Sequence, residues 1–245
     1  MSEIGIIGGT GLTSLPELEI VRREVVYTPY GEPSGPVSHG VLNGVEVAFL
    51  ARHGLGHTIP PHRVNYRANI WALKSIGVRR IVAVAAVGGI RSDMAPGSIA
   101  IPDQIIDYTY GRSHTFFEHD LEEVKHIDFT EPYCGQCRGV LIDAARAQGL
   151  AVIEDGTYAA AQGPRLETAA EVNRLERDGC DIVGMTGMPE TALARELDLS
   201  YACCAVIANW AAGRGEVDIH ADIEANLANG MDKVKALLQA ALPDL

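Results

Sequence analysis

Residues 80–89 read Arg-Ile-Val-Ala-Val-Ala-Ala-Val-Gly-Gly, and no other stretch says as much about the architecture. A run that is apolar at nearly every position indicates a strand buried on both faces of a sheet. Apolar runs at 4–7, 45–50 and 201–208 alternate with helix-like patterns such as 65–76. This order predicts an α/β fold of three layers, α/β/α, around a mixed β-sheet.

Further segments continue the alternation. Strands are predicted at 98–106, 151–160 and 181–183, and helices at 138–148, 168–179, 190–196 and 223–242. Between them, residues 107–132 are rich in Tyr, His, Phe and acids, and they form a long surface excursion of the kind that often serves function or an interface. Because no repeat, linker or boundary interrupts the order, residues 1–245 are predicted to form a single domain.

The composition is that of a globular protein. Among 245 residues, 47% are hydrophobic and 21% are charged, and the formal net charge is −12. An acidic chain without a basic run is a poor match for a nucleic-acid backbone, so no nucleic-acid partner is expected. An anionic substrate would therefore need locally placed positive charge.

The five cysteines and the N-terminus indicate a protein of the reducing cytoplasm. The cysteine count is odd, the start has no basic leader, and no apolar stretch is long enough to span a membrane. We therefore expect a soluble cytoplasmic protein without a disulfide framework or membrane contact. Cys134 and Cys137 have the spacing of a redox or zinc pair, but no second ligand pair accompanies them, so no metal is predicted.

Two short turns rich in glycine each follow an apolar run and precede a segment expected to be helical. They are Gly8-Gly9-Thr10-Gly11 and Gly184-Met185-Thr186-Gly187. Backbone N–H groups at such turns have no partner within the helix, and a threonine hydroxyl beside them completes a cradle for a phosphate-sized anion. The two turns are predicted to be halves of one anion site.

Basic residues follow the strand expected at 45–50. Arg52 and His53 stand where the sheet of an α/β protein opens onto its ligand crevice, and arginine offers a two-pronged fork to phosphate oxygens. A surface arginine and a structural histidine are the alternative. The next loop, residues 57–66, places two His, an Arg, an Asn and a Tyr around a pair of prolines.

Five motifs in this order resemble the methylthioadenosine/purine nucleoside phosphorylase family. They are Gly8-Gly9-Thr10-Gly11, Ala51-Arg52-His53-Gly54, Val64-Asn65-Tyr66-Arg67-Ala68-Asn69, Gly163-Pro164-Arg165 and Val183-Gly184-Met185-Thr186-Gly187-Met188-Pro189-Glu190. The resemblance spans almost the whole chain. It implies that inorganic phosphate, as co-substrate, cleaves a purine nucleoside to the free base and a pentose 1-phosphate. It also implies a homotrimer with active sites near subunit interfaces, and neither metal nor organic cofactor.

The resemblance assigns phosphate and sugar contacts residue by residue. Phosphate-binding positions of the family match Thr10, Arg52, His53 and Thr186, and Met185 matches the residue that packs on the ribose. One position departs from the family pattern, because a threonine that often holds phosphate is replaced here by Ala85. Two further substrate contacts are expected from Ala86 and Leu166.

Two positions predict a 6-oxopurine base. Asn209 stands where relatives specific for 6-aminopurines carry Asp, and an amide can donate to O6 or N7 where a carboxylate would repel O6. Glu167 matches the family's acceptor for N1–H. The alternatives are that Asn209 caps a helix and that Glu167 is a capping-box acid near Thr168. Trp210, next to Asn209, is expected to line the base pocket.

The 5′ substituent of the sugar is predicted to be a methylthio group. His126 matches a histidine that a neighbouring subunit places near this group in the family, and the residues expected to form an apolar wall are Val217, Ile219 and Ile223. A hydrogen bond from His220 to a 5′-hydroxyl is the alternative. The expected substrate is S-methyl-5′-thioinosine, which would give hypoxanthine and 5-methylthioribose 1-phosphate.

Three other functions stay open at this point. A general purine nucleoside phosphorylase would act on inosine and guanosine, and a methylthioadenosine phosphorylase would accept adenine despite Asn209. A nucleotide-binding regulatory module without catalysis is the third. The first turn lacks the third glycine of the dinucleotide-binding pattern, which argues against the module.

Overall fold

The structure, a computed structural model, describes residues 2–119, 121–216 and 218–245 and is built around one large mixed sheet. Its strands are β1 (Ile4–Gly8), β2 (Glu19–Glu24), β3 (Val37–Leu42), β4 (Val45–Ala51), β5 (Arg80–Gly89), β6 (Ile99–Ala100), β7 (Gln104–Asp107), β8 (Thr157–Ala160), β9 (Ile182–Gly184) and β10 (Ser200–Trp210). The main path runs β2-β3-β4-β1-β5-β9-β8-β7, while β10 pairs with β5 and β6.

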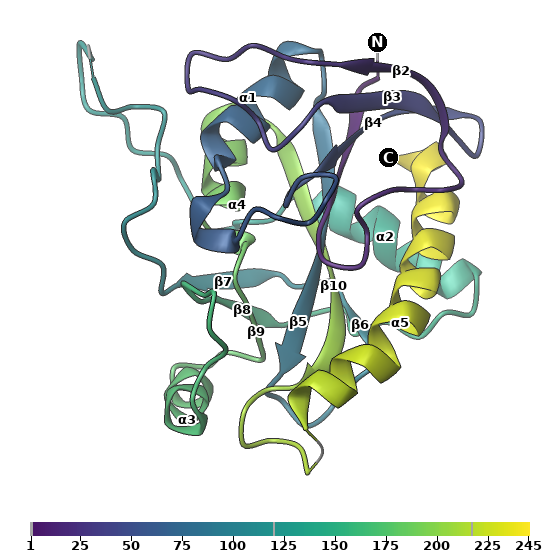
Figure 1. The fold of residues 1–245 in the computed structure, drawn as a ribbon, viewed down its shortest axis with the longest axis vertical. Helices are drawn as coiled ribbons and strands as arrows, with labels where there is room; N and C mark the ends of the chain where they lie inside the picture. Colours follow the sequence, from purple (N-terminus) through teal and green to yellow (C-terminus); the bar gives the residue numbers. More distant parts are fainter. Residues whose placement is uncertain (1, 120, 217) are drawn as a thin grey trace.

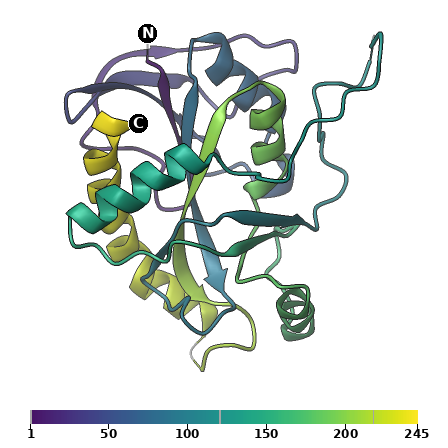
Figure 2. The same ribbon diagram turned by 180° about the vertical axis from the view of Figure 1, so that it is seen from behind.

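Helices cover both faces of this sheet. They are α1 (Tyr66–Ser75), α2 (Gly135–Ala147), α3 (Ala169–Arg177), α4 (Gly187–Glu196) and α5 (Ile219–Ala241), with 3-10 turns η1 (Pro61–Arg63) and η2 (Leu242–Asp244). α2 and α5 pack on one face and α1 and α4 on the other (Figures 1 and 2). Alternate residues of β5 enter the two cores, Val82 and Val84 one and Ala83 and Ala85 the other. The predicted three-layer fold is thereby confirmed.

The central strand β5 carries different neighbours along one of its edges. Its first half pairs with β1 in parallel, up to the Ile7–Ala83 pair, and its last two residues pair with β9 in the opposite direction. The carboxyl ends of β1 and β9 therefore point at each other along β5, where the sheet splits. The two glycine turns follow these ends, which explains why segments so distant in sequence meet.

Several local predictions were wrong. No helix follows the first glycine turn, because Leu12, Leu15 and Leu18 bury themselves in the core through a chain of turns before β2. The strand expected at 98–106 is two short strands, β6 and β7, and only the end of 151–160 is a strand, β8. The antiparallel strands β2 and β3 were not expected; every residue of β2 is at least partly exposed, so it lacks an apolar pattern.

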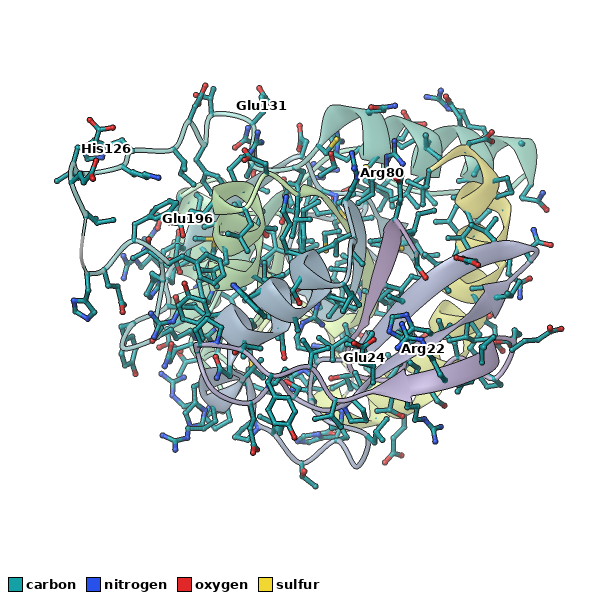
Figure 3. All side chains as sticks on the ribbon, turned by 90° about the horizontal axis from the view of Figure 1, so that it is seen from above. Arg22, Glu24, Arg80, His126, Glu131 and Glu196 are labelled. Atoms are coloured by element: carbon teal, nitrogen blue, oxygen red, sulfur yellow. The ribbon has the colours of Figure 1, made fainter. Side chains whose placement is uncertain are left out.

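The long excursion between β7 and α2, residues 108–133, projects from the body of the molecule, and we call it the arm (Figure 1). Its base is tied down by Glu196 of α4, which accepts hydrogen bonds from the Thr115 hydroxyl and the Phe116 backbone N–H. His126 lies on the outer part of the arm, away from the sheet (Figure 3). Among the described residues, no helix is long and apolar enough to cross a membrane.

Candidate active site

A cavity of about 370 Å³ opens where the sheet splits. Its walls come from the two glycine turns, the loop after β4, the middle of β5, the loop before α3, the end of β10 and the start of α5. Predicted site residues that line it are Thr10, Arg52, His53, Ala86, Leu166, Glu167, Met185, Thr186, Asn209, Ile219 and Ile223. The structure thus brings residues from all parts of the chain to one place.

Arg52 is the most deeply buried cation of this site, with 1% of its surface exposed. Its Nε and Nη2 donate to the two oxygens of Glu190, at 2.6 and 2.7 Å, and Nη1 donates to the Val84 carbonyl at 2.8 Å. That carbonyl belongs to the stretch of β5 between the pairing regions of β1 and β9. Arg52 therefore closes the split in the sheet as well as lining the cavity.

The ion pair between Arg52 and Glu190 removes the free arginine charge that the sequence predicted for this site. The arginine fork expected to hold phosphate oxygens holds Glu190 instead, and the Tyr201 hydroxyl donates to the same carboxylate at 2.7 Å. Glu190 raises the pKa of Arg52 despite burial, so the Arg52 guanidinium group stays charged and is paired with Glu190. A bound anion would depend on neutral donors and on the remaining Arg52 hydrogens. Sequence reasoning missed Glu190 and Tyr201; Glu190 ends the last quoted motif, whereas Tyr201 gave no signal.

His53 is held as a neutral ring. Its Nδ1 lies 2.8 Å from the carbonyl oxygen of Ile59, which can only accept, so Nδ1 carries the hydrogen. Burial, together with the nearby Arg52 charge, lowers the pKa of His53 to about 4. The free Nε2 is thus an acceptor at neutral pH, and it suits a phosphate oxygen that carries a hydrogen.

The depressed pKa of His53 sets a pH dependence of stability. Between about pH 4 and the ordinary value of 6.5, the unfolded chain binds a proton at this position and the folded chain does not. The unfolding free energy therefore falls as pH decreases through this window, by on the order of 2 kcal/mol for this group. Urea titrations at pH 5 and pH 7 measure the fall in unfolding free energy between these two values. We expect this fall to be smaller in a His53→Asn variant than in the wild type, by the contribution of His53. Equal declines in variant and wild type would contradict the assignment.

The two threonines remain available to a ligand. Thr186 precedes α4 at the N-cap position, but its side chain makes no capping hydrogen bond, although the residue is only 7% exposed. Thr10 lies on the opposite side of the split, after β1. Gly9 lets this turn approach closely, since a β-carbon there would lie 2.5 Å from the Val84 carbonyl oxygen and 2.8 Å from Arg52 Nη1.

Glu167 lines the cavity with an unsatisfied oxygen. Its Oε1 is buried and has no hydrogen-bond partner, and burial raises the pKa of the carboxyl group. The capping alternative is wrong, because the box at the start of α3 consists of Thr168 and Glu171. A buried acceptor without a partner destabilises a protein unless a ligand satisfies it. Glu167 is therefore placed to accept a hydrogen bond from a ligand.

Asn209 lies in β10, so its helix-capping alternative is also wrong. Its amide nitrogen donates to the Trp210 carbonyl oxygen at 2.7 Å, which leaves Oδ1 and one N–H hydrogen for a ligand. An acceptor from Glu167 and an amide from Asn209 in one cavity suit the polar edge of a planar heterocycle.

Two predicted substrate contacts lie outside the cavity, and a third cannot be placed because it falls outside the described residues. Trp210 does not line the cavity, because alternation along β10 turns its side chain to the other side, against Gly215. His126 lies on the outer part of the arm (Figure 3) and is not among the residues that line the cavity of its own chain. Val217 falls outside the described residues. Conversely, the sequence gave no role in the cavity to Ile59 and Pro60, which line it beside His53.

The cavity of this α/β fold brings Thr10, Thr186 and His53 together with the polar side chains of Glu167 and Asn209. The chain belongs to the phosphorylase superfamily, whose family model matches residues 3–243. It is 57% identical, over 99% of both chains, to a probable S-methyl-5′-thioinosine phosphorylase of Pseudomonas syringae. It is 47% identical to the 6-oxopurine nucleoside phosphorylase of Pyrococcus furiosus, over 99% of this chain and 93% of that one.

Solved structures agree with this membership. A methylthioadenosine phosphorylase from Schistosoma mansoni in complex with adenine superimposes with a TM-score of 0.92. It is 34% identical, and the match covers 99% of this chain and 91% of that one. The resemblance inferred from the five motifs is confirmed.

Proposed function

We propose that this protein is a purine nucleoside phosphorylase that converts S-methyl-5′-thioinosine and phosphate into hypoxanthine and 5-methylthioribose 1-phosphate. A phosphate oxygen forms a bond to C1′ while the bond between C1′ and the purine nitrogen breaks, and its electron pair moves into the base. Thr10, Thr186 and His53 hold the phosphate on one side. Glu167 and Asn209 hold the leaving base on the other, where negative charge develops in the transition state.

The unpartnered Glu167 oxygen is the observation that carries this proposal. A 6-oxopurine has a hydrogen on N1 that this carboxylate can accept, whereas a 6-aminopurine has a lone pair there and would face a second acceptor. The Asn209 amide can donate to O6 or N7 and can accept from N7 once that atom is protonated. Hypoxanthine satisfies both side chains, and adenine leaves the carboxylate unpaired.

The 5′ side of the cavity favours an apolar substituent. Ile219 and Ile223 of α5 line the cavity, while His220 between them is exposed and lies outside it. A 5′-hydroxyl against the two isoleucines would lose its hydrogen bonds to water, whereas burial of a methylthio group contributes about 1 to 2 kcal/mol. His220 therefore gives little support to the hydroxyl alternative.

We further propose a homotrimer in which the arm of one chain reaches the active site of its neighbour. The arm projects from the body of its own chain with His126 on its outer part (Figure 3), and His126 does not line the cavity of that chain. We propose a cytoplasmic role in purine salvage, with phosphate as co-substrate and without metal or organic cofactor. The molecular mass in solution tests the assembly.

A panel of four nucleosides tests the substrate. With phosphate and a metal chelator present, we expect kcat/KM for methylthioinosine to exceed that for inosine at least tenfold, as expected for about 1.4 kcal/mol. Release of adenine from methylthioadenosine or adenosine should be small. Ile223→Thr should narrow the preference for the methylthio substrate, and the matched control His220→Ala should not.

Different outcomes support different alternatives. Equal rates with inosine and methylthioinosine would identify a general 6-oxopurine enzyme and refute the 5′ assignment. Efficient adenine release would refute the role of Glu167. Nucleoside binding without phosphate-dependent turnover would leave only the regulatory module.

A further inference from the structure

Arg112 lies outside the cavity and makes hydrogen bonds to several segments that line it or lead to it. It belongs to the base of the arm and is not among the residues that line the cavity. Its guanidinium group lies over the ring of Tyr66, with 5.5 Å between the guanidinium carbon and the ring centroid. No ion pair joins it to a carboxylate within the described ranges. A half-buried cation without an acidic partner must be held by other acceptors.

Those acceptors come from three separate chain segments around the cavity, and of their residues Met185 lines it. Nη1 donates to the carbonyls of Met185 and Met188, at 2.9 and 2.6 Å, and to the Tyr66 hydroxyl at 3.3 Å. Nη2 donates to the Gln162 carbonyl at 2.8 Å and, more weakly, to that of Ala161 at 3.4 Å. Nε donates to the Gln162 side chain at 3.2 Å. Every nitrogen of the guanidinium group is engaged.

Two of these segments carry or lead to a side chain assigned to the substrate, and the third is hydrogen-bonded to a loop that lines the cavity. The carbonyls of Met185 and Met188 flank Thr186, so their hold on Arg112 fixes the peptide planes of the phosphate turn. Gln162 begins the loop that leads to Glu167. The Tyr66 hydroxyl donates to the carbonyl of Pro61, in the loop that also lines the cavity.

The turn and the loop also contact each other directly. Gly163 has a φ of +62°, and a β-carbon there would lie 2.5 Å from the sulfur of Met185. A shift of one segment therefore displaces the other. Because Arg112 binds the backbone of both, it sets the distance between the groups that hold phosphate and the group that holds the base.

We propose that Arg112 is a positioning residue that fixes the phosphate turn relative to the base loop, and thereby aligns phosphate with the nucleoside. This inference rests on the proposed phosphorolysis. A planar guanidinium group can reach these acceptors at once, whereas a lysine ammonium group is a single point with three donors. Correct alignment of two reactants is worth orders of magnitude in rate, and a displacement of about 1 Å can lower the rate about 100-fold.

The test compares Arg112 with Arg67, another arginine that holds the base of the arm. Arg67 donates to the Thr115 carbonyl and to Glu118 but to no residue of the cavity. We expect Arg112→Lys to lower kcat about 10- to 100-fold while the variant remains folded. Arg67→Lys should change kcat less than about twofold. The melting temperature and the molecular mass of both variants are measured beside the rates.

Chemical rescue separates positioning from a structural role. In Arg112→Gly, guanidinium ion at tens of millimolar should occupy the vacated position and raise kcat at least fivefold, while urea at the same concentration should not. Guanidinium should not accelerate Arg67→Gly. Equal losses in the Arg112 and Arg67 variants, or losses that only follow the melting temperature, would overturn the proposal. A wild-type enzyme without phosphorolysis would instead refute the proposed function.

Discussion

Glu190→Gln should lose about 3 to 5 kcal/mol of unfolding free energy, because it leaves the Arg52 cation buried without its counter-ion. The two groups are 1% and 0% exposed, so water cannot replace the lost partner. Urea unfolding at pH 7 measures the loss. We also expect a higher KM for phosphate than for the wild type, since Arg52 lines the cavity beside Thr10 and Thr186.

The structure supplies two controls for this prediction. Glu154 pairs with Arg146 in the same two-pronged geometry, at 3.0 and 2.7 Å, but both residues are exposed. Glu154→Gln should therefore change stability by less than about 1 kcal/mol. The triple variant Arg52→Met, Glu190→Leu, Tyr201→Phe removes the three polar side chains of the buried cluster and leaves only the Val84 carbonyl. It should regain most of the stability but not the activity, and a triple variant as unstable as Glu190→Gln would refute the electrostatic explanation.

The sequence predicted the fold well where local pattern and burial agree. β5 is apolar throughout because both of its faces are covered, and its continuous run identified it as the central strand. The strand β2 was not predicted because it lies at the exposed edge of the sheet, where polar residues are tolerated. The helix predicted after the first glycine turn is absent for another reason. Leu12 and Leu15 are buried in the core without forming a helix, and local sequence propensity does not show where a side chain packs.

The sequence predicted which residues line the site, but it did not predict the hydrogen bonds and ion pairs between them. Arg52, His53 and Thr186 were chosen by motif, and the structure places them in one cavity. Glu190 reaches the Arg52 guanidinium group because α4 packs against α1 and β10, and no spacing in the sequence reveals that packing. Arg112 gave no signal because it acts through backbone carbonyls of distant segments, and any residue type can supply a carbonyl.

Glu167→Gln should separate function from stability. We expect kcat/KM for the 6-oxopurine substrate to fall about 10- to 100-fold, since a hydrogen bond to a charged acceptor is worth about 1.5 to 3 kcal/mol. The unfolding free energy of the ligand-free protein should not fall. Burial raises the pKa of this carboxyl group in the folded state, so above its ordinary value of 4.5 the wild type loses stability as pH rises, and the glutamine variant does not.

Glu171, four residues further along, provides the opposite case. It is exposed, pairs with Arg165 and completes the capping box of α3, and these contacts lower its pKa to about 2. Glu171→Gln should therefore reduce stability at pH 7 and leave kcat/KM nearly unchanged. The reverse result, activity lost at Glu171 and kept at Glu167, would remove Glu167 from base recognition. A buried acceptor that has no partner until the base binds destabilises the ligand-free protein. Replacing the residue that recognises the base should therefore not lower the unfolding free energy of the ligand-free protein.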